Sequence, residues 1–133
     1  MPAVDTHVLL RHIVQDDAAQ SEAATRLIRE CVSAGQTLFV PVTVALEVEW
    51  VLRARYGFTK EAVMATLSAL LSAAELTFES ERALEVALQL YRDGSADVAD
   101  GLHIALAAQA GELPLWTFDR RAARLRGAAR VEG

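Results

Sequence analysis

Several features that mark common protein classes are scarce or absent in this sequence. Cys31 is the single cysteine among 133 residues, so no disulfide bond can form within the chain. No apolar run approaches the ~18 residues that a membrane-spanning helix requires. The first residues also lack the basic start and long apolar stretch of a signal peptide. Together these absences predict a cytoplasmic protein that does not cross a membrane.

Motifs of several enzyme classes are missing as well. The sequence has no Gly-rich phosphate loop and no G-x-S-x-G nucleophile motif. Its three histidines and one cysteine are scattered, without the spacing of a zinc site. Trp50 and Trp116 lie in apolar runs, and we predict them to be core residues rather than base-stacking platforms.

Positive charge is limited and unevenly distributed. The chain has 18 acidic and 13 basic residues, for a net charge of −5, which argues weakly against binding nucleic acid through bulk electrostatics. Basic residues form two clusters, one at Arg53, Arg55 and Lys60 and one from Arg120 to Arg130. Each cluster is either a solvated face or part of a basic rim around an acidic centre.

The residues that are present favour one folded α/β domain over positions 1–133. Apolar residues make up 53% of the chain, and no repeat or linker interrupts it. Short apolar segments alternate with helical patterns, which is typical of a parallel sheet covered on both faces. We therefore predict a three-layer α/β/α sandwich with a central, mainly parallel sheet. The expected strands are 2–5, 37–41, 76–79, 114–119 and 129–132, and the expected helices are 7–14, 16–33, 43–56, 59–73, 80–94, 95–110 and a short one after 119.

Local signals place the ends of these elements. Thr43, Thr59 and Ser80 are expected N-caps, because a side-chain oxygen there can accept a hydrogen bond from the first helical turn. Ser95 or Asp97 is expected to open the helix that ends near residue 110.

Acidic residues follow two of the predicted strands. Asp5 ends the first strand and Asp119 ends the strand at 114–119. In a parallel α/β sheet, binding sites lie beyond the carboxyl ends of the strands, so both side chains are expected at one rim. Either residue alone is more readily explained as the N-cap of the following helix.

Two further acids are predicted on the apolar faces of helices. At 100° per residue, Glu47 falls near Val44, Trp50 and Val51, whereas Glu49 falls on the opposite, solvated side. A carboxylate facing a core is costly unless it is paired or binds a cation.

Asp100 is likewise predicted on an apolar helix face, in the helix expected at 95–110. It shares a helix face with Ile104, Ala107 and Asp97. We interpret Asp97 mainly as a helix cap, favoured there by the helix dipole, and Asp100 as a site residue.

Four carboxylates from separate elements, Asp5, Glu47, Asp100 and Asp119, therefore have the potential to face one pocket. No lysine is nearby to neutralise them, and oxygen ligands of this kind suit Mg²⁺ or Mn²⁺. Acidic sites with one or two such metals activate a water molecule for attack on a phosphodiester. Because bound metal inverts the local charge, an acidic pocket is compatible with a nucleic-acid substrate.

Four segments together resemble a known family. "VDTHVLLRHIVQDD", "VPVTVALEVEWVLRARYGFT", "DVADGLHIALA" and "LWTFDRR" are similar, in order and spacing, to the motifs of PIN-domain ribonucleases, and most of all to VapC-type toxins of toxin–antitoxin pairs. The resemblance implies a Mg²⁺- or Mn²⁺-dependent endoribonuclease that hydrolyses RNA phosphodiester bonds. It also implies a homodimer and a small antitoxin that occupies the active site and binds operator DNA, so that DNA is contacted only indirectly.

The same resemblance assigns individual residues. It places the family's catalytic and metal-binding acids at Asp5, Glu47, Asp100 and Asp119, with Asp97 as an additional acid of the third motif. Thr6 and Thr117 match the hydroxyl residues beside the first and last acids. His7 departs from the family, which usually has Asn there. We expect the RNA-binding rim to include Arg53, Arg55, Arg120 and Arg121.

Two other functions are alternatives to the ribonuclease. A catalytically inactive PIN-like module that acts through protein binding would not need the complete acid set. A phosphatase or receiver domain of similar layout would need an acid two residues after Asp5 and a well-placed lysine. Position 7 is His, and the one lysine, Lys60, opens a helix.

Overall fold

Contacts divide the chain into two units, Met1–Glu79 and Ser80–Gly133, in a computed structural model that describes residues 1–132. The prediction of a single domain over the whole chain stays a prediction.

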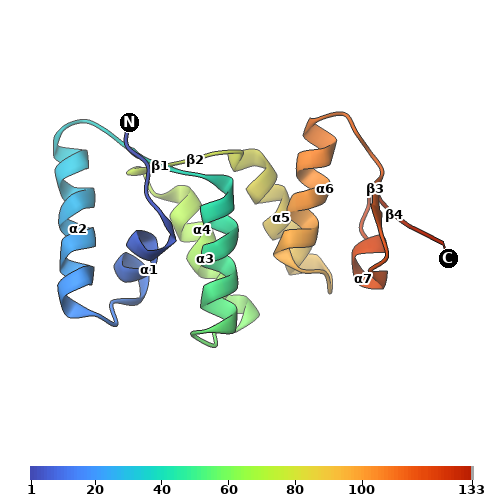
Figure 1. The fold of residues 1–133 in the computed structure, drawn as a ribbon, viewed down its shortest axis with the longest axis horizontal. Helices are drawn as coiled ribbons and strands as arrows, with labels where there is room; N and C mark the ends of the chain where they lie inside the picture. Colours follow the sequence, from blue (N-terminus) through green and yellow to red (C-terminus); the bar gives the residue numbers. More distant parts are fainter. Residues whose placement is uncertain (133) are drawn as a thin grey trace. The chain divides into compact units, whose positions relative to one another are not determined.

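The first unit contains four helices and two short strands (Figure 1). Helix α1 (Thr6–Val14) contacts both α2 (Ala18–Ser33) and α3 (Val42–Ala54), and α3 contacts α4 (Lys60–Ser72). The core of this unit consists of aliphatic side chains that are almost fully buried, including Leu9, Leu10, Val40, Val48 and Leu52. The elements are α1 (Thr6–Val14), α2 (Ala18–Ser33), β1 (Leu38–Val40), α3 (Val42–Ala54), α4 (Lys60–Ser72) and β2 (Leu76–Phe78).

Strands β1 and β2 pair in parallel, with Leu38 opposite Leu76 and Val40 opposite Phe78. The strand predicted at 2–5 forms only a single parallel bridge, between Ala3 and Phe39. Its shortness has a local cause, because α1 begins at Thr6 and leaves few residues to extend.

The second unit packs two long helices together and carries a second parallel strand pair. Gly101 of α6 (Val98–Gln109) lies against Ala87 of α5 (Glu81–Asp93), so closely that a Cβ atom on Gly101 would be 3.2 Å from the Ala87 Cα atom. Strands β3 and β4 pair in parallel, with Leu115 opposite Ala128. The elements are α5 (Glu81–Asp93), α6 (Val98–Gln109), β3 (Leu115–Thr117), α7 (Arg120–Ala123) and β4 (Ala128–Arg130).

The mixed α/β class and the parallel strand pairing are confirmed, whereas the predicted caps are only partly right. Thr59 caps α4 by accepting a hydrogen bond from the Ala62 amide at 3.1 Å, and Asp97 occupies the N-cap position of α6. The prediction for Thr43 is wrong, because α3 already begins at Val42. Ser80 stands at the N-cap of α5, but its side chain makes no capping hydrogen bond.

Both tryptophans are more exposed than predicted. Trp50 is 48% exposed and Trp116 is 64% exposed, so their assignment to the core is wrong. In β3, side chains alternate between faces, and Trp116 points away from the half-buried Leu115 and Thr117. Trp50 lies beneath the guanidinium of Arg55, whose carbon is 5.9 Å from the ring centroid.

Among residues 1–132, every helix is too short or too polar to span a bilayer.

Candidate acidic site

Asp5 stands where the first extended segment turns into α1. Its backbone is extended, and its carboxylate accepts a hydrogen bond from the Val8 amide at 3.2 Å, so Asp5 is the N-cap of the helix. Capping and ligand binding are compatible, because the Asp5 side chain is exposed and a carboxylate has several acceptor positions.

Thr6 connects the first acid to the second. Thr6 is 3% exposed, and its hydroxyl donates a hydrogen bond to Oε1 of Glu47. This bond joins residues 41 positions apart in the sequence. Within the first unit, the fold therefore brings Asp5, Thr6 and Glu47 into one neighbourhood at the start of α1.

The prediction that Glu47, rather than Glu49, is the glutamate of α3 that faces the protein core is wrong. Glu49 is 2% exposed, whereas Glu47 is exposed. The buried stripe of this helix is Ala45, Val48, Glu49 and Leu52, the helical spacing i, i+3, i+4 and i+7. Arg53 makes this burial possible, because its Nε atom lies 3.0 Å from Oε1 of Glu49.

A cavity of about 370 Å³ adjoins Asp5 between α1 and α2. His7, the residue that departs from the family pattern, lines it beside Asp5. Val8 and Arg11 also line it, and neither was predicted as a site residue from the sequence. The available signal was their spacing, because Val8 lies three residues after Asp5 and Arg11 three residues after Val8, and residues three apart are neighbours on a helix surface. The remaining lining residues are Gln20, Ala23, Ala24 and Leu27.

Arg11 is held in place by polar partners at one end of this cavity. Its guanidinium donates to Gln20 at 2.6 Å, to Asp16 at 3.1 Å and to the Tyr56 hydroxyl at 3.2 Å. The Tyr56 hydroxyl donates in turn to Asp16 at 2.8 Å. These contacts, the Tyr56 hydrogen bond above all, lower the pKa of the Asp16 carboxyl below its ordinary value.

Replacing Tyr56 with Phe should raise the pKa of Asp16 toward its ordinary value, because the strongest donor to the carboxylate is lost. A lowered folded-state pKa stabilises the fold above the ordinary pKa, and this contribution disappears as the pH falls through the folded-state value. The Tyr56→Phe variant should therefore lose less stability on acidification. NMR titration of the Asp16 side-chain carboxyl carbon measures the shift. An unchanged Asp16 titration curve would contradict the proposed role of Tyr56.

In the second unit, two acids meet at the start of α6. The Asp100 carboxylate accepts a hydrogen bond from the Asp97 amide at 3.3 Å. Asp100 is half-buried and Asp97 is exposed. The interpretation of Asp97 as the cap is confirmed, and the bond places the Asp100 carboxylate beside that cap.

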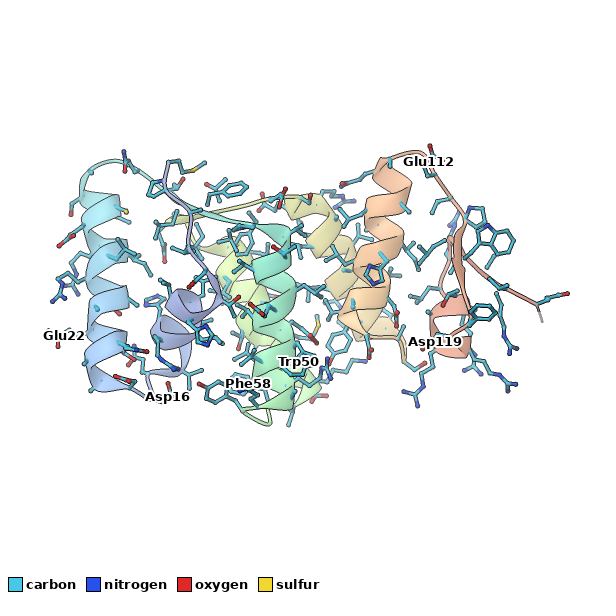
Figure 2. All side chains as sticks on the ribbon, in the orientation of Figure 1. Asp16, Glu22, Trp50, Phe58, Glu112 and Asp119 are labelled. Carbon is cyan, nitrogen blue, oxygen red and sulfur yellow. The ribbon has the colours of Figure 1, made fainter. Side chains whose placement is uncertain are left out.

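Asp119 occupies the end of the segment that follows β3, directly before α7 (Figure 2). Its Oδ1 atom accepts hydrogen bonds from the amides of Arg121 at 2.7 Å and Ala122 at 3.0 Å. The hydroxyl of Thr117 accepts a hydrogen bond from the Asp119 amide at 3.0 Å and so fixes the backbone there. The two amide donors, with the charge of Arg121, lower the pKa of Asp119. Asp119 is therefore ionised at neutral pH, as a metal ligand must be.

The four arginines expected in the RNA-binding rim differ in their contacts. Arg53 pairs with the buried Glu49, and Arg55 lies over Trp50. Arg120 and Arg121 are exposed in the single turn of α7, immediately after Asp119.

The donor atoms of these acids fit a hard divalent cation. Carboxylate oxygens are the ligands that Mg²⁺ and Mn²⁺ prefer. Taken alone, neither unit has, within the described residues, three or more His, Cys, Asp or Glu side chains grouped so that they could hold a metal ion. Asp5 and Glu47 belong to the first unit, and Asp97, Asp100 and Asp119 belong to the second.

The model of the PIN domain matches residues 3–128 of this sequence, which is nearly the whole chain. The chain belongs to the PIN-domain family. PIN domains are generally nucleases and typically use divalent metal ions, in agreement with the carboxylates described above. The match extends over both units of this PIN protein. No curated protein sequence matches the chain.

Proposed function

We propose that this PIN protein is a Mg²⁺- or Mn²⁺-dependent endoribonuclease and that it acts as the toxin of a toxin–antitoxin pair. The observation that carries the proposal is the hydrogen bond from Thr6 to Glu47, beside Asp5. It joins the first and second acidic motifs in space, as a shared metal site requires.

In this proposal, Asp5, Asp100 and Asp119 ligate the metal directly, and Glu47 completes the site either as a ligand or through water. Asp97 is an additional acid. When bound, the metal supplies a Lewis acid that withdraws charge from the phosphodiester and makes water a better nucleophile. Hydrolysis forms one bond from water oxygen to phosphorus and breaks one bond from phosphorus to a ribose oxygen.

The chain's own residues hold this chemistry in place. Thr6 fixes the orientation of the Glu47 carboxylate through its hydroxyl. The Thr117 hydroxyl fixes the backbone at Asp119. His7 lines the cavity beside Asp5, where it is positioned to contact the substrate. Arg53, Arg55, Arg120 and Arg121 supply positive charge for the phosphates of an RNA strand.

Cleavage of a structured RNA should require added divalent metal. The purified protein should cut total RNA in Mg²⁺ or Mn²⁺ and stop cutting when EDTA is added, because the carboxylates alone repel the phosphodiester. Gel electrophoresis with end-labelled fragments measures the products. Restored cutting after excess Mn²⁺ is returned controls for irreversible loss of the protein. Equal cutting in EDTA would contradict metal dependence, and no cutting with any metal would favour an inactive module that acts by protein binding.

The toxin role also requires protein partners. The protein would form a homodimer, and a small antitoxin would occupy its acidic site and bind operator DNA. Induction of the protein alone in cells should then arrest growth, with new RNA ends detectable by sequencing, and co-expression of a small neighbouring gene should reverse the arrest. Growth unaffected by an RNA-cleaving protein would contradict the toxin role and leave the nuclease proposal intact.

A further inference from the structure

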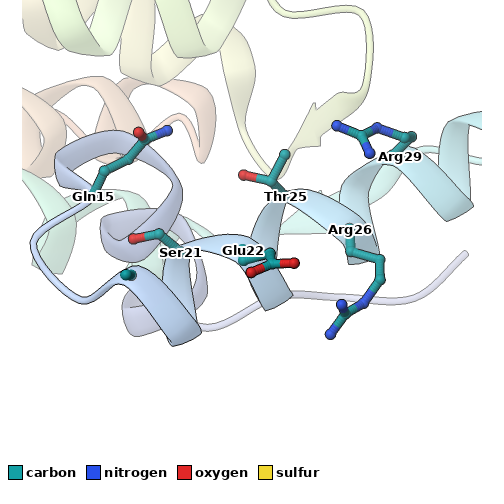
Figure 3. A pocket seen from close by; sticks show the side chains of 7 residues that line it. Gln15, Ser21, Glu22, Thr25, Arg26 and Arg29 are labelled. Carbon is teal, nitrogen blue, oxygen red and sulfur yellow. The ribbon is translucent and has the colours of Figure 1, made fainter.

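A second cavity of the first unit lies along a different side of α2. It has a volume of about 450 Å³, and no residue is shared between its lining and that of the cavity beside Asp5. Figure 3 shows Gln15 facing Ser21 and Thr25, with Arg29 extending toward them from farther along α2. The lining residues are Gln15, Ala18, Ser21, Glu22, Thr25, Arg26 and Arg29.

Ser21 carries a polar atom that the fold leaves unsatisfied. The residue is 7% exposed, and its hydroxyl oxygen has no hydrogen-bond partner among the described residues. A buried hydroxyl normally finds a partner, because burying it without one loses its hydration with no compensation. Since Ser21 lines the cavity, a bound group there has the opportunity to supply the missing partner.

The cavity also has cationic side chains that lack a carboxylate partner. Within residues 1–132, no ion pair involves Arg26 or Arg29. One carboxylate, Glu22, lines the cavity with them, so the lining has one more positive than negative charge. In Figure 3 Arg29 extends toward Thr25, whereas Arg26 points away from it.

We propose that this cavity binds a phosphate group, with Arg29 as the charged donor and Ser21 as the hydroxyl donor. A guanidinium presents several N–H donors in a fork that matches phosphate oxygens. A phosphate offers enough acceptor oxygens to take a hydrogen bond from each donor. Thr25 already shares a hydrogen bond of 3.2 Å with the His12 ring, so Thr25 is a wall of the site.

The phosphate has two sources that the same chemistry would accept. One is free inorganic phosphate, and the other is a nucleotide of an RNA strand, whose sugar would fill the rest of the cavity. The RNA source rests on the proposed ribonuclease function, whereas the phosphate site itself does not.

The experiment measures binding to the full chain without divalent metal, in an Asp5→Asn background that is expected to reduce any cleavage. NMR titration follows the amides of α2 with two probes, inorganic phosphate and a short oligoribonucleotide. Both probes are expected to shift the Ser21 and Arg29 amides. The variant Arg29→Gln should weaken binding by about tenfold or more, as expected for loss of a charge-assisted hydrogen bond. Ser21→Ala should weaken it by severalfold without lowering the melting temperature, because no partner in the protein is lost.

Two further variants separate a built site from general electrostatic attraction. Glu22→Gln should strengthen binding, because it removes the one opposing charge of the lining. Arg82→Gln removes an exposed arginine that does not line the cavity, and it should change affinity by less than about twofold, as expected for a charge screened by solvent.

Each outcome of the titrations supports or contradicts the proposed phosphate site. A tighter complex with the oligoribonucleotide than with phosphate, lost in Arg29→Gln, supports the site and assigns it to RNA. Equal affinity for the two probes supports the site and assigns it to free phosphate. Wild-type affinity in both Ser21→Ala and Arg29→Gln, an effect of Arg82→Gln equal to that of Arg29→Gln, or no binding of either probe would overturn the proposal. None of these outcomes depends on whether the protein cuts RNA.

Discussion

Replacing Asp5 with Asn should reduce RNA cleavage by about 100-fold or more while leaving the fold intact. Loss of one anionic ligand weakens metal binding and the several kcal/mol of charge stabilisation that a metal supplies, and each 1.4 kcal/mol is a factor of ten in rate. The fold survives because Asn is as good an N-cap as Asp, so the Asn side chain still accepts from the Val8 amide. Initial cleavage rates of a labelled RNA at saturating Mn²⁺ measure the effect.

Asp17 offers a matched control for this experiment. It caps α2 in the same way that Asp5 caps α1, accepting a hydrogen bond from the Gln20 amide at 3.0 Å. Asp17→Asn makes the same chemical change at the same kind of position, outside the proposed acid set. Its cleavage rate should match the wild type. Equal rates for Asp5→Asn and the wild type would remove Asp5 from the site, and equal losses in both variants would attribute the effect to capping.

Replacing Gly101 with Val should lower the free energy of unfolding by about 2–3 kcal/mol, within the range for inserting methyl groups into a packed interface. A Cβ atom at this position would stand 3.2 Å from the Ala87 Cα atom and 3.3 Å from its carbonyl oxygen. Backbone atoms cannot rotate away as a side chain does, so α5 and α6 must separate. The expected fall in melting temperature is on the order of 10 °C, measured by circular dichroism.

The control for Gly101 is Ala108→Val, an exposed position on the same helix. It introduces the same β-branched residue, whose lower helix propensity alone costs less than about 0.7 kcal/mol. Gly101→Ala should fall between the two variants, since better helix propensity offsets part of the clash. A Gly101→Val variant as stable as Ala108→Val would show that the α5–α6 contact is looser than described.

The sequence predicted the order of elements well, because the signals for them are local. Thr59 and Asp97 lie at helix starts where side-chain oxygens satisfy exposed amides, and such capping depends on neighbours only three residues away. Asp5 and Asp119, the acids that end the first and fourth predicted strands, were likewise expected as caps, and both are. The PIN family was evident from four motifs in order, and the family match confirms it.

Helix α3 is the clearest case in which local reasoning failed. Its sequence contains two overlapping stripes, one through Glu47 and one through Glu49, and both are largely apolar. The helix wheel cannot choose between them, because the choice depends on which side meets the other helices. Packing against α1 and α4 selected the stripe of Val48 and Leu52, and Glu49 was buried with it.

The sequence by itself determined the fold class and the family, since composition, periodicity and motif order carry that information. Only the tertiary structure decided which partners the predicted acidic residues meet. The bond from Thr6 to Glu47 spans 41 residues, and whether the Ser21 hydroxyl finds a partner depends on its surroundings, which within residues 1–132 supply none. Both features depend on how elements distant in sequence pack together, and patterns within a short stretch of sequence do not encode that packing.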